Sequence, residues 1–153
     1  MDCTPLFTKA KKASRTMNIL ETDAINKILT EVADAAVENT KYILAENQKD
    51  LVLMGESDPR YDRLMLTAGR IEDIASDIRN VAKMQGPVGK VLMKNTRQNG
   101  LVISKISVPF GVIGVIYEAR PNVTFDVFSL SLKSGNVCIL ADSRGVTSLG
   151  RKG

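Results

Sequence analysis

The sequence of 153 residues contains no histidine and no tryptophan, and only two cysteines. Without histidine, a Ser-His-Asp triad, histidine acid–base catalysis and histidine-ligated zinc are excluded within these residues. Cys3 and Cys138 lie far apart and match no metal-binding or redox spacing, so we predict no metal site. No apolar segment follows the basic N-terminal residues as in a secretory signal. We therefore expect a cytoplasmic protein with reduced thiols.

Long hydrophobic runs and dense charge are also scarce. The apolar runs 112–117 and 137–141 are far shorter than the roughly 20 residues of a membrane-spanning helix. The net charge is +4, and aromatic residues make up only 5% of the chain, whereas nucleic-acid-binding domains usually combine a basic face with aromatic side chains. We expect neither a membrane nor a nucleic-acid partner. The one basic cluster is interpreted as a solvated helix face, formed by Lys9, Lys11, Lys12 and Arg15.

Apolar residues recur at helical spacing through the first half of the chain. We predict a helix that Thr22 caps and Asn39 interrupts, followed by a second helix that ends at Gly55. A third helix would begin after a cap at Thr67 and close at Gly86-Pro87. It carries the clearest apolar stripe, formed by Ile71, Ile74, Ala75, Ile78 and Ala82.

The pattern then changes to that of strands. Residues 90–98 and 101–108 are β-prone, and the Asn99-Gly100 dipeptide between them tolerates positive φ at both central positions of a hairpin turn. Both faces of the second strand carry apolar residues. We therefore expect the hairpin to pack against other structure on both sides, such as another subunit.

A strand, a helix and a strand follow within about thirty residues, which predicts a right-handed βαβ unit and a parallel sheet. Residues 111–117 are almost wholly apolar, as in a strand buried on both faces. Pro121 suits the first turn of a helix that ends at Ser134-Gly135, and residues 136–140 form the second buried strand. The glycines of 111–114 do not follow the strand, so they are not a dinucleotide fingerprint. On spacing alone, they permit close packing.

A longer string is much more specific. Residues 108–124, VPFGVIGVIYEARPNVT, resemble the signature of the γ-glutamyl phosphate reductases of the aldehyde dehydrogenase superfamily, and residues 132–136, LKSGN, resemble another of their motifs. The resemblance runs from about residue 5 to residue 140 and corresponds to the amino-terminal part of that family. Further segments match in the same order, at 44–51, 62–67, 70–71, 86–89 and 99–101.

The resemblance implies an α/β, aldehyde dehydrogenase-like fold with N-terminal helices and a β-hairpin. Residues 1–140 would form an incomplete Rossmann-type NADP-binding domain, in which residues 88–108 are a hairpin for homo-oligomerisation. Residues 141–153 are polar, glycine-rich and unlike the family, so we expect a disordered tail there.

The same resemblance implies a reaction, the NADPH-dependent reduction of L-glutamyl 5-phosphate to glutamate 5-semialdehyde in proline biosynthesis. In that family a cysteine thiolate attacks the acyl phosphate, and hydride then reduces the thioester. The family's nucleophile lies beyond residue 153, and neither cysteine present replaces it: we expect Cys138 to be a small hydrophobe in a strand and Cys3 to lack an activating partner. The chain alone is expected to be inactive; the alternative function is a non-catalytic binding or assembly module.

The candidate site is the tetrapeptide Ala119-Arg120-Pro121-Asn122. It lies between the end of a predicted parallel strand and the start of a helix, where α/β sheets bind ligands. By the resemblance, Ala119, Arg120 and Pro121 border the cofactor, and Asn122 donates a hydrogen bond to the thioester oxyanion.

Each of the two polar residues also has a simpler interpretation. Arg120 could clamp a phosphate of the substrate or of the cofactor, or it could form a structural ion pair with Glu118 or Asp126. Asn122 could be a helix cap, alone or in addition to its role toward the oxyanion.

Overall fold

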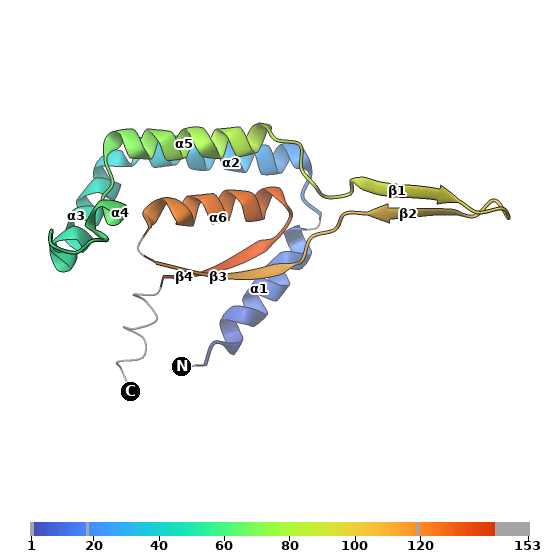
Figure 1. The fold of residues 1–153 in the computed structure, drawn as a ribbon, viewed down its shortest axis with the longest axis horizontal. Coiled ribbons are helices and arrows are strands. Elements are labelled where there is room, and N and C mark those ends of the chain that lie inside the picture. Colours follow the sequence, from blue (N-terminus) through green and yellow to red (C-terminus); the bar gives the residue numbers. More distant parts are fainter. Residues whose placement is uncertain (1, 18, 119, 143–153) are drawn as a thin grey trace.

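A computed structural model describes residues 2–142 of the chain apart from Asn18 and Ala119. Helices occupy the first half, and a hairpin and a βαβ unit follow (Figure 1). The elements are α1 (Thr4–Met17), α2 (Thr22–Glu38), α3 (Thr40–Met54), α4 (Tyr61–Leu64), α5 (Ala68–Lys83), β1 (Val91–Thr96), β2 (Val102–Ile106), β3 (Val112–Tyr117), α6 (Pro121–Lys133) and β4 (Val137–Asp142).

The βαβ unit is the part of the fold that positions the candidate site. Strands β3 and β4 pair in parallel, from Val112 opposite Val137 to Tyr117 opposite Asp142, which confirms the predicted parallel pair. Pro121 is in the first turn of α6, where the N–H that proline lacks would have no helical partner. Asn136 joins the beginnings of the two strands, because its Oδ1 accepts a hydrogen bond of 2.8 Å from the Gly111 amide.

Helices α2, α5 and α6 form two layers above this sheet (Figure 1). Helix α6 lies on the sheet, and α2 and α5 lie side by side on α6. Ala33 of α2 and Ala75 of α5 are fully buried, and side chains this small allow the helices to approach closely. The core between the layers also contains Leu29, Ile78 and Leu132.

A buried lysine also joins the two helical layers. The Nζ atom of Lys133, at the end of α6, donates hydrogen bonds to the Ala82 carbonyl of α5, at 2.8 Å, and to Oδ1 of Asn26 in α2. Burial lowers the pKa of this amino group, because a charge loses favourable hydration there. Its hydrogen bonds replace part of that hydration and fix the end of α6 under α5.

The helix boundaries follow most of the predicted capping signals. The Thr67 hydroxyl accepts a hydrogen bond of 3.1 Å from the Arg70 amide, which confirms the predicted cap of α5. Gly55 follows α3 with a φ of 80°, as predicted. The predicted cap at Thr22 is wrong: Glu21 occupies the cap position, and Thr22 is already helical. Helix α5 ends at Lys83, before Gly86-Pro87, because the backbone of Met84 is already extended.

The hairpin extends away from the helices and the parallel sheet (Figure 1). Its turn is a three-residue loop and not the two-residue turn expected from Asn99-Gly100. The Gly100 amide bonds to the Arg97 carbonyl at 2.9 Å, and the Arg97 amide bonds to the Leu101 carbonyl at 2.8 Å. Gly100 has a φ of 82°, which is typical of the left-handed position that closes such a loop.

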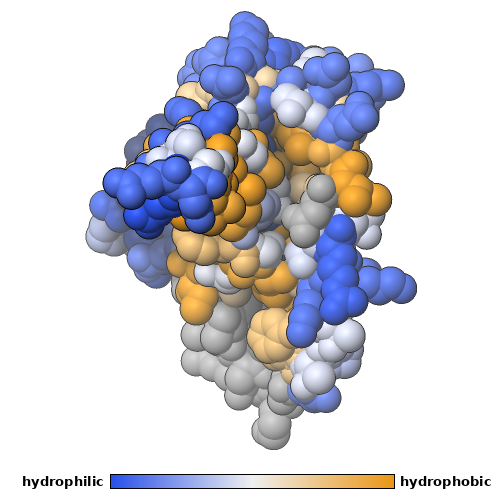
Figure 2. Space-filling view, turned by 90° about the vertical axis from the view of Figure 1, so that its right-hand side faces the viewer, coloured by the Kyte–Doolittle hydropathy of each residue, from blue (hydrophilic) through white to orange (hydrophobic). Residues whose placement is uncertain are grey.

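The described part of the chain does not cover either face of the hairpin. Every residue of β1 and β2 is exposed, including Val102 and Ile106. Figure 2 views the molecule with the hairpin toward the reader, and hydrophobic side chains lie behind its polar tip.

Strand β3 is less covered than expected. Ile116 is 77% exposed and Val112 is also exposed, whereas Ile113 and Val115 between them are half-buried. The predicted burial on both faces is therefore wrong here, because α6 covers one face and α1 contacts the sheet mainly through β4. Cys138 of β4 is likewise half-buried, and Cys3 is exposed.

Strand β4 continues to Asp142, two residues into the segment predicted to be a tail. Residues 143–153, the rest of that segment, lie outside the described residues.

Candidate functional site

A pocket of about 420 Å³ lies at the start of α6, beside the carboxyl end of β3. Three parts of the chain line it: residues 62–66, one side of α5 from Arg70 to Asp77, and the first turns of α6. The pocket adjoins a hollow of about 260 Å³, because Arg63 and Arg120 line both. Ligands of open α/β sheets bind at strand ends of this kind.

The predicted site residues Arg120, Pro121 and Asn122 all line this pocket. Ala119 lies outside the described residues. The helix-cap alternative for Asn122 is wrong, because Arg120 occupies the cap position of α6 and no side chain caps this helix. The Asn122 side chain is exposed at the pocket, where its amide can donate to a ligand.

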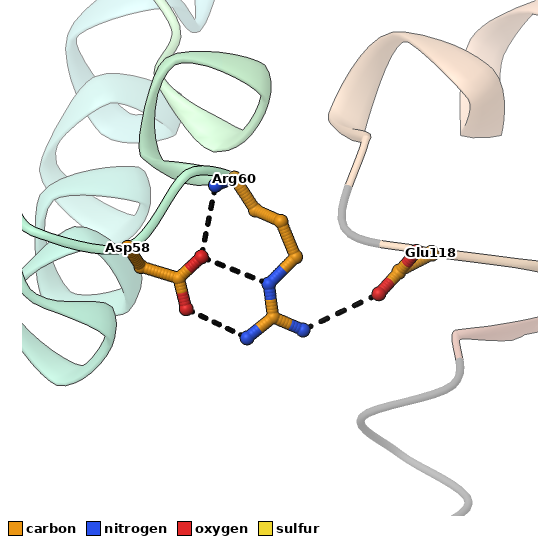
Figure 3. A network of polar contacts seen from close by, with 3 residues as sticks. All are labelled: Asp58, Arg60 and Glu118. Atoms are coloured by element: carbon orange, nitrogen blue, oxygen red, sulfur yellow. Dashed lines mark hydrogen bonds and ion pairs between the residues drawn. The ribbon is translucent and has the colours of Figure 1, made fainter.

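The ion-pair alternative for Arg120 is also wrong. Neither Glu118 nor Asp126 lies within 4 Å of the Arg120 guanidinium, and Glu118 pairs with Arg60 instead. Figure 3 shows this network: the Arg60 guanidinium donates to both oxygens of Asp58, at 2.9 and 2.6 Å, and to Glu118 at 3.3 Å. The hydrogen bonds from Arg60 to Asp58 lower the pKa of the Asp58 carboxyl to about 2.

Arg60 thereby connects the loop before α4 to the end of β3, across 58 positions of sequence. With Arg63 and Arg120 it forms a group of three guanidinium side chains around the smaller hollow. Sequence reasoning missed Arg60 and Arg63. Arg63 lies within the segment 62–67 that carries the family resemblance, and this was the only signal.

Two side chains hold residues 62–66 in place at the pocket. The Arg70 guanidinium donates to the carbonyls of Asp62 and Met65, at 2.7 and 2.6 Å, and to the Asp62 carboxylate at 3.0 Å. The buried Asn47 side chain donates to the Leu64 carbonyl at 2.9 Å and accepts from the Leu66 amide at 2.8 Å. Both hold the short helix α4 and the two residues that follow it in place.

Helices α5 and α6 contribute three carboxylates to the lining of the pocket. Asp73 and Asp77 of α5 and Asp126 of α6 line it, and none has a Lys or Arg nitrogen within 4 Å among the described residues. Burial and the nearby negative charge of Asp77 both raise the pKa of Asp126, with burial the larger cause. The sequence analysis considered Asp126 only as a partner of Arg120, and it missed the other two carboxylates.

The site is therefore polar and charged, with arginines and carboxylates both in its lining, and two of these residues, Asp62 and Arg70, pair with each other. Among the described residues, no three His, Cys, Asp or Glu side chains are placed to hold a metal ion. In the same part of the chain, no helix has the length and apolarity needed to cross a membrane. Neither cysteine lines the pocket.

These features define a class of protein: an α/β chain whose parallel βαβ unit carries a pocket at a strand end and a helix N-terminus. No family model matches the chain. It is 57% identical over 140 residues to the γ-glutamyl phosphate reductase of Bacteroides fragilis, covering 92% of this chain and 34% of that protein. The reductase of Bacteroides thetaiotaomicron is also 57% identical, over 134 residues, with 88% and 32% covered.

Solved structures agree with this result. The γ-glutamyl phosphate reductase of Thermotoga maritima matches with a TM-score of 0.85 and 34% identity, covering 92% of this chain and 35% of that chain. The reductase of Saccharomyces cerevisiae matches with a TM-score of 0.83 and 31% identity, covering 94% and 38%. The chain is a homologue of γ-glutamyl phosphate reductase and spans about a third of the length of these relatives. The predicted family resemblance and the α/β class are confirmed.

Proposed function

We propose that this chain forms part of a γ-glutamyl phosphate reductase, an oxidoreductase of proline biosynthesis in the cytoplasm. The reaction would be the NADPH-dependent reduction of L-glutamyl 5-phosphate to glutamate 5-semialdehyde. The observation that carries the proposal is the 57% identity over 92% of the chain. The pocket supports it, because the exposed side chains of Arg120 and Asn122 meet there at the first turn of α6.

The arginines suit the phosphate chemistry of this reaction. Guanidinium groups bind phosphate oxygens bidentately, and the N-terminus of a helix favours negative charge. Arg63 and Arg120 have no carboxylate partner within 4 Å among the side chains that the structure describes, which end at residue 141, so both can bind an acyl phosphate or a phosphate of the cofactor. Bound NADPH would supply the hydride, with residues 119–121 at its border.

Asn122 would stabilise the oxyanion that forms when the acyl group is attacked. Its side-chain amide is an uncharged donor that is not used as a helix cap. A fixed donor that points at developing negative charge lowers the barrier because it needs little reorganisation during the reaction.

The nucleophile would come from outside this chain. Cys3 lies just before α1 and Cys138 near the start of β4, and neither lines the pocket. We therefore expect the isolated chain to show no phosphate-dependent oxidation of glutamate 5-semialdehyde, the reverse reaction. Turnover that disappears in a Cys138→Ser variant would contradict this part of the proposal.

A chimeric enzyme tests the main proposal. The matching third of the Bacteroides fragilis reductase is replaced by the corresponding residues of this chain, and NADPH consumption with L-glutamyl 5-phosphate is measured. We expect an active enzyme in which Asn122→Ala lowers kcat by about 10²–10³-fold. The control is Asn80→Ala, an exposed asparagine on α5 that does not line the pocket. A folded chimera without activity would refute the proposed function.

A second candidate function is that of an assembly module, and the exposed hairpin favours it. A two-stranded hairpin is marginally stable in water on its own, and apolar residues on both faces need a cover. We expect the chain to self-associate through it in sedimentation velocity experiments. Val102→Lys and Ile106→Lys should reduce the association, whereas Gln98→Lys, which adds the same charge at the polar tip, should not. A monomeric wild-type chain at high concentration would count against this function.

A further inference from the structure

The lining of the pocket beside α6 carries charges of both signs, and Asp62 and Arg70 within it pair with each other. Arg63 and Arg120 line the part that it shares with the smaller hollow, and Asp77 and Asp126 line the part between α5 and α6. Arg120 is the N-cap residue of α6, and Asp126 lies six positions further along the same helix. Six positions correspond to about 9 Å along a helical axis. A ligand that satisfies both groups must carry opposite charges at a similar separation.

We propose that this pocket recognises the amino-acid end of the substrate and so fixes the orientation in which the substrate binds. The acyl phosphate binds at Arg63 and Arg120, and the α-ammonium binds between the carboxylates of Asp77 and Asp126. This proposal rests on the proposed function, to which it adds the residues that recognise the α-ammonium group.

The length of the ligand agrees with this arrangement. In L-glutamyl 5-phosphate, six covalent bonds separate the α-nitrogen from the phosphorus. Two fully extended residues of a polypeptide contain the same number of backbone bonds and span about 7 Å. The flexible side chains of both arginines cover the remaining distance.

The carboxylates of Asp77 and Asp126 can pair with the ammonium group of a ligand. Neither Asp77 nor Asp126 has a Lys or Arg nitrogen within 4 Å among the residues that the structure describes. Asp126 is half-buried, and the raised pKa of its carboxyl reflects this burial together with the charge of Asp77. A bound cation would relieve both effects, because it stabilises the ionised carboxylates.

Two ligands test the proposal on the full chain. The first is 2-amino-6-phosphonohexanoate, in which methylene groups replace the carbonyl and the bridging oxygen of the substrate, so that it neither hydrolyses nor cyclises onto its own amino group. The second is its N-acetyl derivative, which has no ammonium charge. Isothermal titration calorimetry should show that the N-acetyl derivative binds about tenfold more weakly, as expected for loss of a charged hydrogen bond.

Variants of Asp77 and Asp126 show whether these two carboxylates cause the difference in affinity between the ligands. Asp77→Asn and Asp126→Asn should weaken binding of the parent analogue about tenfold and leave the N-acetyl derivative unaffected. Asp50→Asn, at an exposed aspartate of α3 outside the pocket, is the matched control. Circular dichroism shows whether each variant is folded. In the active chimera, Asp126→Asn should raise the KM for glutamate 5-semialdehyde about tenfold with little change in kcat.

The outcomes separate this proposal from the proposed function. Equal affinity for both ligands, or wild-type affinity for the parent analogue in both pocket variants, overturns the assigned orientation and leaves the reductase function standing. If neither ligand binds the wild-type chain or the chimera, the substrate pocket itself is refuted, and the assigned orientation with it.

Discussion

Replacement of Asn47 by alanine should destabilise the chain and release the segment that forms one wall of the pocket. Asn47 is 6% exposed and comes from α3. Its side chain bonds to the Leu64 carbonyl and to the Leu66 amide, so one residue satisfies two backbone groups on a neighbouring segment. Alanine keeps the helix but cannot replace either hydrogen bond.

The magnitude follows from what the substitution leaves behind. Each lost hydrogen bond is worth about 1 kcal/mol net, and a buried backbone group without a partner costs about 1–3 kcal/mol. Leu64 is 1% exposed, so water reaches this region poorly. The better helix propensity of alanine offsets only about 0.5 kcal/mol. We expect a loss of about 2–4 kcal/mol, a large part of the 5–15 kcal/mol typical of a domain.

Urea unfolding followed by circular dichroism measures this loss, with Asn80→Ala as the control. Asn80 is exposed on α5, and no hydrogen bond of its side chain is found among the described residues. That variant should stay within about 0.5 kcal/mol of the wild-type chain. Amide exchange should also accelerate at Leu66 in the Asn47→Ala variant. A loss no larger than that of the control, with Leu66 still protected, would refute the reasoning.

Three further predictions concern the side chains of Asp126, Asp58 and Thr67. Asp126→Asn should stabilise the chain at pH 7, because the raised pKa of Asp126 means that its ionisation costs folded-state stability; thermal melts should show the gain shrinking as the pH falls through the raised pKa toward the ordinary value of 3.8, and a gain that persists below 3.8 would contradict this. NMR titration should give Asp58 a pKa of about 2, which Arg60→Gln should shift back toward 3.8; an unchanged value would show that Arg60 is not the cause. Thr67→Ala should cost about 1 kcal/mol in urea unfolding, because α5 loses the bond at its N-terminus, and an unchanged midpoint would argue against the cap.

The elements whose signals are local in sequence could be predicted. Pro121 starts α6, Thr67 caps α5 and Gly55 ends α3, because each of these effects acts within one helical turn. The parallel pairing of β3 and β4 also followed from sequence, because a short crossover helix between two apolar runs leaves few other topologies. The family resemblance depended on a continuous string, residues 108–124, for which no three-dimensional information was needed.

The apolar pattern of a strand did not predict its burial, because burial depends on how many other elements pack against the sheet. An apolar run such as 112–117 has the composition of a strand buried on both faces, yet Ile116 is 77% exposed. Sequence records the apolar character of the side chain but not whether a second layer covers it. The turn of the hairpin differed for a related reason: Asn99-Gly100 is compatible with more than one loop length, and pairing of Arg97 with Leu101 selects one of them.

By itself, then, the sequence determined the long helices, the βαβ unit, the family and the position of Arg120 and Asn122 at a helix start, but not the short helix α4. Only the tertiary structure decided which charges surround them. Residues 62–66, the acidic side of α5 and the start of α6 are separated by up to about sixty positions, and they meet because α5 packs on α6. Likewise, Glu118 pairs with Arg60 and leaves Arg120 available to a ligand. The physical reason is that Coulomb and hydrogen-bond energies depend on distance in space, which the spacing of residues along the chain does not give.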